Sequence, residues 1–422
     1  MKKIVALALT LLLALGMIPV ANAEQEVTVT MFQLKVEIDS ALQAFAAAYS
    51  EATPGVTVKI ETLGGGADYG AALKAKLQAG QMPTLYNIEG KGGYDLWKDN
   101  MSDMSDCAWV KDTDFAYVGD DGKVVGFPVA VEGFGLGYNA EILEKAGIDP
   151  ATLTTYSAVK AAFEKIDGMK ADLGLDSVVS MATSIAGGMW WVTGNHNFNA
   201  YLAGGLAYDD TSVLDKLLKG EVDAERLADY CNYVKLLFDY ADQNVLTNGN
   251  YDAQVSAFAQ GKAAFLHQGN WVDPNMKQLG VTFKMGYISH CFTDKQEMTG
   301  LFMAAPSWYC LNSGAPEAEQ KAAKDFLDYM ATTAEGADYM VNQAGMVPAF
   351  KSVSLKPTGQ FSAALVEASA KGGNFNWRFG SMPDGTGQNV LGPIFDLFAQ
   401  DHSDAAALAQ YLTDAIKTIP SM

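Results

Sequence analysis

The sequence predicts an α/β protein built as two lobes that are joined by strands. A chain of 422 residues is too long for one ordinary domain and fits two. Strand-like and helix-like runs alternate from residue 27 onward, which is typical of an open parallel sheet with crossover helices. Residues 122–139 are rich in β-formers and glycine and have no helical period. Because no low-complexity linker appears, we expect these strands to carry the chain between the lobes and to act as a hinge.

The first elements follow one another in a regular order. Strands are predicted over 27–34, 56–63 and 84–90, and helices over 40–52 and 69–80. The first helix has apolar residues at helical spacing, and a Pro-Gly pair ends it. Ligands of such sheets bind beyond the carboxyl ends of the strands, so polar residues at those ends are candidate ligand contacts.

The rest of the chain is mostly helical. Apolar residues recur at helical spacing in residues 156–174, 225–244, 318–345 and 404–419, and the third of these segments is predicted as a pair of helices. A short strand-like run, 263–266, ends in small polar residues and then in a single tryptophan, Trp271. That tryptophan is either a ligand platform at the mouth of a strand or a residue that covers the edge of the core.

The N-terminus has the pattern of a secretory signal peptide. Lys2 and Lys3 precede an apolar run over 4–18, and small residues at 21–23 suit a cleavage site before Glu24. The apolar run is too short for a membrane span. The segment has no cysteine to carry a lipid anchor. We therefore expect residues 1–23 to be removed and the protein to be periplasmic and diffusible.

The net charge argues against some classes of binding partner, and the cysteine content leaves the disulfide pattern open. With 29 Lys and Arg against 49 Asp and Glu, the net charge is −20, which disfavours nucleic acid and anionic lipid. Four cysteines allow three fully paired connectivities, and free buried thiols are an equal alternative. Cys291 and Cys310 end strand-like runs, which would suit neighbouring strands.

Motifs for catalysis or metal binding are missing from the sequence. The four histidines are scattered, no C-x-x-C or G-x-S-x-G occurs, and the glycine-rich residues 64–70 lack the Lys-Ser/Thr of a P-loop. We therefore predict no catalytic residue, no metal and no cofactor. Two carboxylates from distant loops would suffice for a glycosidase, so a secreted carbohydrate-active enzyme stays open as an alternative.

Three segments resemble one known family. Residues 126–166 carry Pro128, Glu132 and the pair Tyr138-Asn139; residues 258–274 carry a Gly-Lys-Ala-Ala strand and Gly-x-Trp; and residues 322–349 form a helix pair followed by Gly and Pro. Together they are similar to the extracellular solute-binding proteins of ABC transporters, in the carbohydrate-binding branch that includes maltose-binding protein. The resemblance covers essentially the whole chain after the signal peptide.

The resemblance implies a two-lobe periplasmic-binding-protein fold that closes on its ligand. The first lobe would span 24–131 and 307–352, and the second would span 132–306 and 353–422. The implied function is that of a monomeric binding protein, which takes a sugar or oligosaccharide in the cleft and delivers it to the permease subunits of an importer. A polyol or glycerol phosphate is the alternative ligand, and it would depend on a basic residue such as Lys35 or Arg378.

The resemblance also assigns candidate ligand contacts. Trp271 falls at a stacking tryptophan, and Glu132 falls at a carboxylate that accepts hydroxyl hydrogen bonds near the hinge. Only one of the adjacent Trp190 and Trp191 can readily face the cleft. The polar residues after the first and third strands, the segment around 188–205 and the loop around Trp377 complete the set: Gln33, Lys35, Asn87, Glu89, Lys91, Trp190, Asn195, Asn197 and Arg378. Polar residues, not Trp377, align with the last stacking aromatic of the maltose-binding branch, which argues against a maltodextrin.

Overall fold

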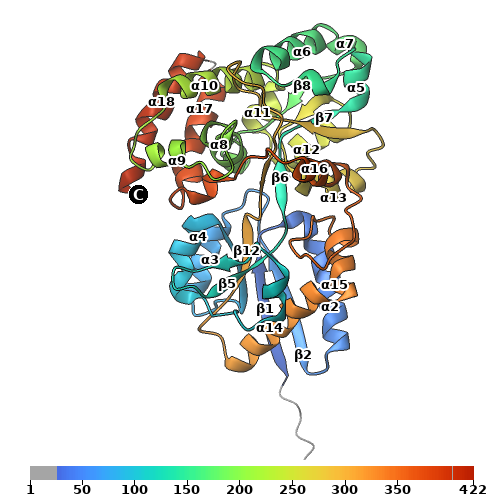
Figure 1. Cartoon of the computed structure of the whole chain (residues 1–422), viewed down its shortest axis with the longest axis vertical. Helices are drawn as coiled ribbons and strands as arrows, with labels where there is room; N and C mark the ends of the chain where they lie inside the picture. The colour runs from blue at the N-terminus through green and yellow to red at the C-terminus, as the bar shows by residue number, and fades with distance from the viewer. Residues whose placement is uncertain (1–25, 402) are drawn as a thin grey trace, which may run out of the picture.

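The computed structural model describes residues 26–401 and 403–422, and it places two α/β lobes one above the other (Figure 1). The predicted signal peptide lies outside the described residues. The first lobe is built on a six-stranded sheet in the order β2-β1-β3-β12-β5-β4. Its strands are β1 (Val27–Gln33), β2 (Val56–Thr62), β3 (Leu85–Glu89), β4 (Tyr117–Val118), β5 (Val124–Pro128) and β12 (Ser307–Leu311).

Helices pack on this sheet through one apolar face each. In α2, Leu42, Phe45, Ala46 and Tyr49 are buried, and this i, i+3, i+4, i+7 spacing puts them on a single side of the helix. The helices of the first lobe are α2 (Asp39–Ala52), α3 (Tyr69–Gln78), α4 (Gly90–Trp97), α14 (Glu317–Thr332) and α15 (Ala334–Asp338).

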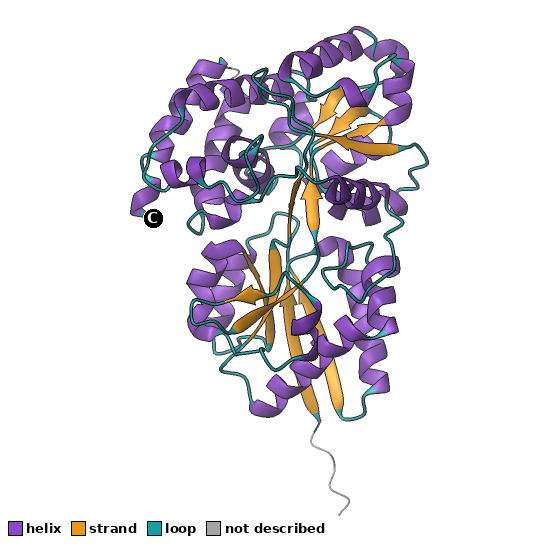
Figure 2. Ribbon diagram, in the orientation of Figure 1, coloured by secondary structure: helices purple, strands orange, loops and turns teal. Residues whose placement is uncertain are grey.

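The second lobe is built on a four-stranded sheet in the order β10-β7-β9-β8, and helices surround it (Figure 2). The strands are β7 (Leu136–Asn139), β8 (Ser177–Ser180), β9 (Ala263–Leu266) and β10 (Met285–Ile288). The helices are α5 (Ala140–Lys145), α6 (Tyr156–Gly168), α7 (Lys170–Leu173), α8 (Asn199–Ala203), α9 (Ser212–Leu217), α10 (Ala224–Asp239), α11 (Gln243–Asn248), α12 (Tyr251–Ala259), α13 (Asp273–Gln278), α16 (Gln360–Lys371), α17 (Gly392–Asp401) and α18 (Ala405–Ile416).

A separate two-stranded ribbon connects the lobes. Strand β6 (Glu132–Phe134) pairs antiparallel with β11 (Phe302–Ala304), and Figure 1 shows β6 running from one lobe to the other. A bridge between Val131 and Val347 adds a third segment at the same place. The predicted two-lobe fold with a strand hinge is therefore confirmed. The residue boundaries of the lobes and the hinge motion stay predictions.

Two details differ from the sequence-based expectation. Strands β1, β2 and β3 are parallel as predicted, but β12 runs antiparallel to its neighbours β3 and β5, because the chain returns from the second lobe to complete the first. Cys291 and Cys310 are not on neighbouring strands: Cys310 is on β12, and Cys291 follows β10 in the other sheet. All four cysteines are free, buried thiols. Among the described residues, no helix is long and apolar enough to cross a membrane.

Candidate ligand-binding site

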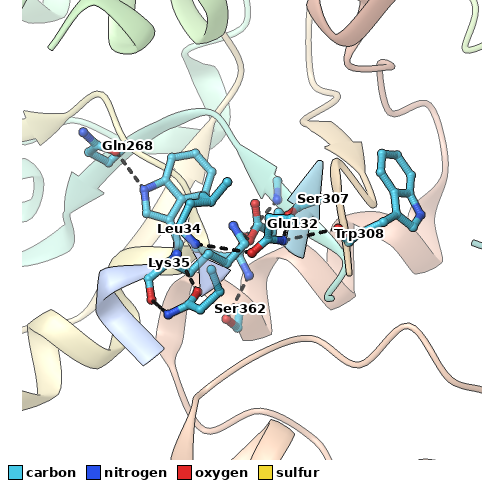
Figure 3. Close-up of polar contacts among 12 residues, drawn as sticks. Leu34, Lys35, Glu132, Gln268, Ser307, Trp308 and Ser362 are labelled. Carbon is cyan, nitrogen blue, oxygen red and sulfur yellow. Dashed lines mark hydrogen bonds and ion pairs between the residues drawn. The ribbon is translucent and has the colours of Figure 1, made fainter. Parts of the chain in front are cut away.

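A buried ion pair lies where the first lobe meets the hinge. Lys35 follows β1, Glu132 is the first residue of β6, and their Nζ and Oε1 atoms are 2.5 Å apart (Figure 3). Each side chain is only 8% exposed. Burial opposes the charge on Lys35, but the carboxylates of Glu132 and Glu37 outweigh it and raise the pKa of the lysine above its ordinary value. Lys35 therefore stays protonated and positively charged at neutral pH.

Two predicted ligand residues instead hold the turn that carries Lys35. The side chain of Gln33 accepts a hydrogen bond from the Lys35 N–H at 2.7 Å and donates to the Lys35 carbonyl at 3.0 Å. Asn87 accepts from the Leu34 N–H at 3.3 Å and donates to Ser307 Oγ at 2.9 Å. Both side chains are fully buried, so in this arrangement their amides position Lys35 and are not presented to a ligand.

A second carboxylate, Glu37, faces the same ion pair. The charge of Lys35 already has a partner in Glu132, so Glu37 is a surplus acid in a partly dehydrated place. Burial raises the pKa of Glu37 to about 7, the charge of Lys35 offsets this only in part, and the nearby charge of Glu132 adds to the rise. Near neutral pH this carboxyl group therefore exchanges its proton with solvent.

Trp271 stands beside this charged group, at the mouth of β9. Its indole Nε1 donates to Gln268 Oε1 at 2.9 Å. The preceding residue ties it to the hinge: Asn270 Oδ1 accepts from the Gly133 N–H at 2.9 Å, and Asn270 Nδ2 donates to Ser362 Oγ at 3.2 Å. The tryptophan is thus fixed relative to β6 and to α16.

Asp273 is the first residue of α13, but its side chain caps a different helix. Its carboxylate accepts from the backbone N–H groups of Phe361 at 3.1 Å and Ser362 at 2.7 Å, which are the first free donors of α16. Gly359, before that helix, carries no capping side chain, and a Cβ there would lie 2.2 Å from Asp273 Oδ2. The Trp271 segment is therefore anchored at both ends.

Aromatic rings cover one side of Trp271. Ring centroids lie 5.0 Å away for His196, 6.1 Å for Trp377, 6.4 Å for Trp191 and 6.5 Å for Phe134. The structure thus places Trp191, rather than the predicted Trp190, beside Trp271. Trp190 lies against Gly392 at the start of α17. A Cβ added to Gly392 would be 2.9 Å from the Cβ of Trp190.

Trp271 also lines a crevice between the lobes, so it both covers the core edge and faces the cleft. The crevice has a free volume of about 10 Å³, roughly the minimum for one water molecule. In this arrangement of the lobes the crevice is too small for any ligand larger than water. The crevice is lined by Lys35, Glu37, Ile38, Ala130, Glu132, Asn270, Trp271, Pro274, Ala344, Gly345 and Met346.

Backbone contacts between glycines hold the rims of the cleft together. A Cβ on Gly66 of the first lobe would lie 2.6 Å from the carbonyl oxygen of Gly188 in the second. On another rim, a Cβ on Gly90 would lie 2.2 Å from the carbonyl oxygen of Gly380. Side chains at these points would keep the lobes apart. A larger cavity of about 570 Å³ opens where Gly65 meets the polar residues of α11 and its following loop.

Glu89, at the end of β3, lies near the ion pair: burial raises its pKa, the charge of Lys35 offsets this in part, and the charge of Glu132 adds to the rise. The other predicted residues have partners of their own, and Lys91 pairs with Asp95 within α4 at 2.6 Å. Asn197 is buried and accepts a hydrogen bond from the Tyr230 hydroxyl at 2.8 Å. Arg378 donates to the carbonyls of Tyr208 and Asp210, and the side-chain oxygen of Asn195 lies against Gly387.

Three residues around the ion pair and Trp271 were not among the predicted contacts: Glu37, Gln268 and Asn270. Glu37 is two residues from Lys35, and Gln268 is three residues from Trp271. Closeness in the chain to a predicted contact is therefore the signal that could have found them. Asn270 is adjacent to Trp271, but its hydrogen-bond partners, Gly133 and Ser362, are far away in the chain, so the sequence does not reveal its contacts.

The chain belongs to the family of bacterial extracellular solute-binding proteins. The family model matches residues 44–370, which includes the first strand crossing and the segment around Trp271. The family is described as bacterial extracellular solute-binding proteins, which agrees with the two-lobe architecture.

Among particular proteins, two similar relatives carry sugar-related names. The chain is 25% identical to the multiple sugar-binding protein of Streptococcus mutans over 356 residues, covering 79% of this chain and 77% of the relative. It is 24% identical to the melibiose/raffinose/stachyose-binding protein MelE of Bacillus subtilis over 290 residues, covering 64% and 62%. Both matches are below the identity at which a shared ligand would follow.

Solved structures share the fold. A sugar transporter protein of Bacillus licheniformis in complex with stachyose superposes with a TM-score of 0.74 at 17% identity, covering 93% of this chain and 100% of that one. A putative binding protein of Bacillus subtilis in an open conformation gives 0.73 at 18% identity, covering 95% and 99%.

The surplus acid Glu37 makes stability depend on pH. Its pKa rises from the ordinary 4.5 to about 7 in the folded protein, so the folded state binds the extra proton. This contribution to stability is full below about pH 4.5 and is lost as the pH rises through 7. We predict that Glu37→Gln gains stability relative to the wild type between pH 5 and pH 8.

Urea unfolding at pH 5, 6, 7 and 8 measures the effect. Glu51→Gln, the same substitution on the exposed side of α2, is the matched control and should follow the wild type at every pH. Parallel profiles for Glu37→Gln and the wild type would show that Glu37 ionises in the folded protein as it does in water.

Proposed function

We propose that this protein is the substrate-binding component of an ABC carbohydrate importer. It binds a sugar or oligosaccharide between its lobes, without catalysis, and delivers it to the permease subunits. The observation that carries the proposal is the meeting of the Trp271 indole with the buried Lys35–Glu132 pair in the crevice between the lobes. Family membership and the sugar-related names of the relatives support it.

The chemistry of this site matches a sugar ring. A pyranose has one face of C–H bonds, which an indole can cover and so remove from water, at about 25 cal/mol per Å² of apolar area. The ring's edge carries hydroxyl groups, each of which both donates and accepts hydrogen bonds. Glu132, Glu37 and Lys35 supply acceptors and donors beside the indole. One side chain covers the face while the others bind the edge.

The alternative ligands receive less support. A glycerol phosphate would need a free basic residue, but Lys35 is paired with Glu132 and Arg378 donates to two backbone carbonyls. A carbohydrate-active enzyme would need an acid and a nucleophile placed on either side of a glycosidic bond. Glu132 is instead held in a buried ion pair with Lys35, so its carboxylate is not free to attack a sugar.

A periplasmic location and a monomeric state complete the proposal. The secretory pattern over 1–23 and the extracellular family support export. The two lobes supply both walls of the crevice, so one chain makes a complete site. A soluble binding protein of this kind would carry its sugar to a membrane permease.

A panel of sugars tests the proposal directly. We expect at least one of stachyose, raffinose, melibiose, maltotriose and glucose to bind with a dissociation constant in the micromolar range or below, measured by isothermal titration calorimetry. Chromatography of the same mixtures should recover the sugar uncut. Hydrolysis of the bound sugar would favour the enzyme, and binding of glycerol phosphate alone would favour the phosphate ligand.

Loss of the indole should weaken sugar binding strongly. We predict that Trp271→Ala raises the dissociation constant about 30- to 1000-fold, equal to about 2–4 kcal/mol, and that Trp271→Phe has a milder effect. Because Trp271 packs against four other rings, the Ala variant should also melt at a lower temperature.

Calorimetry and thermal melting of the same variants separate the two roles. Trp308→Phe, in the first lobe, is the control, since its Nε1 donates to the Phe115 carbonyl away from the crevice. A Trp271→Phe variant that melts earlier but binds as tightly as the wild type would make Trp271 a core residue only.

Closure of the lobes should depend on the contact between Gly66 and Gly188 at the rim of the cleft. Gly188→Ala would place a methyl group 2.7 Å from the Gly66 Cα, so the lobes could not meet fully. We predict that the variant shows less compaction in small-angle scattering with the tightest-binding sugar of the panel, and that its affinity falls about tenfold or more.

Gly280→Ala is the matched control. Gly280 has nearly the same backbone angle, φ +70° against +73° for Gly188, so an Ala substitution carries the same local strain. Nothing lies within 4 Å of its added Cβ. Equal compaction of Gly188→Ala and Gly280→Ala would mean that the lobes do not meet at this contact when the sugar is bound.

A further inference from the structure

Three of the four histidines of the chain gather around the end of the hinge strand. Phe134, the last residue of β6, is fully buried. Its ring centroid lies at 5.0, 5.9 and 6.3 Å from the rings of His196, His290 and His267. His267 and His290 also contact each other, with 4.7 Å between their centroids, and each is 1% exposed. These last two residues form a histidine pair inside the core of the second lobe.

The hydrogen bond of His267 fixes its neutral form. Its Nε2 lies 3.2 Å from the carbonyl oxygen of Val192, and because a carbonyl only accepts, Nε2 carries the hydrogen. The other nitrogen, Nδ1, is then bare, and it has no hydrogen-bond partner among the described residues. A proton added at Nδ1 would create a buried charge and a buried N–H without an acceptor, and both oppose folding.

His290 offers no better place for that proton. Its Nδ1 lies 2.8 Å from the hydroxyl of Tyr233, a group that can donate or accept. Its Nε2 has no partner of normal hydrogen-bond geometry among the described residues. A proton on either ring of the histidine pair therefore puts a positive charge next to a second imidazole, without a negative group to balance it.

The titratable and charged groups around the rings also oppose protonation. Burial lowers the pKa of all three histidines, that of His267 to about 4, and nearby backbone groups offset this only in part. His267 and the charge of Lys35, in the first lobe, lower the pKa of His196 further. From α10 comes the Tyr233 hydroxyl, which is neutral because burial raises its pKa well above the ordinary value. No carboxylate among the described residues acts on any of the three rings.

His267 begins the segment that carries Trp271. It follows β9 directly, and the next residue, Gln268, accepts the indole N–H of Trp271. Gly269 then forms a β-bridge with Phe134. Displacement of the His267 ring from its place against Phe134 therefore moves the aromatic platform and loosens its attachment to the hinge strand.

We infer that the histidine pair is an acid-sensitive switch: when His267 takes up a proton, residues 267–271 leave the hinge strand and the ligand site is lost, while the first lobe stays folded. Residues 27–131 and 307–352 of the first lobe contain no histidine, so that lobe lacks the same weakness. The inference concerns the regulation of the proposed site, and only its effect on sugar binding rests on the proposed function.

The lowered pKa of His267 gives the direction of the effect. In the opened segment the histidine has its ordinary pKa of 6.5, so the opened state binds more protons than the closed one. The stabilising contribution of neutral His267 is full above pH 6.5 and is lost as the pH falls from 6.5 to about 4. At pH 5 the difference in pKa favours the opened state by about 30-fold relative to neutral pH.

Replacement of His267 by a residue that does not titrate tests the switch. His267→Gln keeps an N–H group for the Val192 carbonyl. We expect the unfolding constant, measured with urea at pH 7.5 and at pH 5, to rise about 30-fold less on acidification in the variant than in the wild type. A constant loss of packing in the variant cancels in this comparison, and so does the titration of Glu37, which both proteins retain.

Phe265→Leu is the matched control. Phe265 is fully buried on β9, two residues before His267, and it has no titratable group. Its substitution should destabilise the protein by the same factor at both pH values. A pH dependence of His267→Gln within twofold of the wild type would overturn the switch. If His267→Gln does not fold, His290→Asn, whose amide replaces Nδ1 beside Tyr233, carries the test with the same expected difference.

Hydrogen exchange locates the opening. After correction for the intrinsic pH dependence of exchange, we expect amides of residues 263–272 to exchange at least about tenfold faster at pH 5 than at pH 7.5, and those of β1 and β3 to keep their rates. Saturation with the tightest-binding sugar of the panel should suppress this increase. Equal acceleration in both lobes would mean global unfolding and overturn the local switch.

The sugar separates the switch from the proposed function. An increase in exchange that bound sugar leaves unchanged would detach the histidine pair from the ligand site and overturn the inference. If no sugar of the panel binds, the proposed function fails, and the difference in pH dependence between His267→Gln and the wild type still decides whether the acid-sensitive opening exists.

Discussion

The ion pair between Lys35 and Glu132 is the interaction on which the rest of the site depends. Glu132 starts the hinge strand β6, and Lys35 ends the turn after β1, so the pair joins the first lobe to the hinge. Two dehydrated charges stabilise a fold only when their geometry is good, and loss of one partner leaves a buried charge that is strongly destabilising. Gln33 and Asn87 accept hydrogen bonds from the N–H groups of Lys35 and Leu34 and so fix the turn that places the lysine opposite Glu132. A ligand that separates the pair has to give each of the two charges a new partner or new hydrogen bonds.

Trp271 is tied to the same hinge from the opposite side. Asn270 accepts from the backbone of β6, one residue after Glu132, and Asp273 caps α16. The aromatic platform and the ion pair therefore share one short strand as their common support. A rotation of the lobes about β6 would change the distance between Lys35 and Trp271 without deforming either lobe, which suits a site that opens and closes around a ligand.

The sequence predicted the architecture better than the site. Alternating strand and helix patterns and the β-rich residues 122–139 were enough for two lobes and a strand hinge, because these features are local. The pairing of Lys35 with Glu132 joins residues almost a hundred positions apart, and no periodicity reports it. Likewise, a π-helical turn, Val192–Asn197, follows Trp191 directly. The sequence pattern does not reveal this turn, so it could not decide whether Trp190 or Trp191 lies beside Trp271. The cap that Asp273 provides for α16 likewise joins residues that lie far apart in the chain.

The charge of the site and the net charge of the whole protein both disfavour an anionic ligand. Among the residues that line the crevice, Lys35 is the one cation, and Glu132 already neutralises it, so Glu37 leaves the crevice neutral or negative according to pH. A net charge of −20 repels anions at long range as well. An anionic ligand would therefore be slowed on approach and would find no free positive group on arrival. A neutral, hydroxyl-rich ligand escapes both penalties, and it can satisfy Glu37 in either protonation state, because a hydroxyl donates to a carboxylate and accepts from a carboxylic acid.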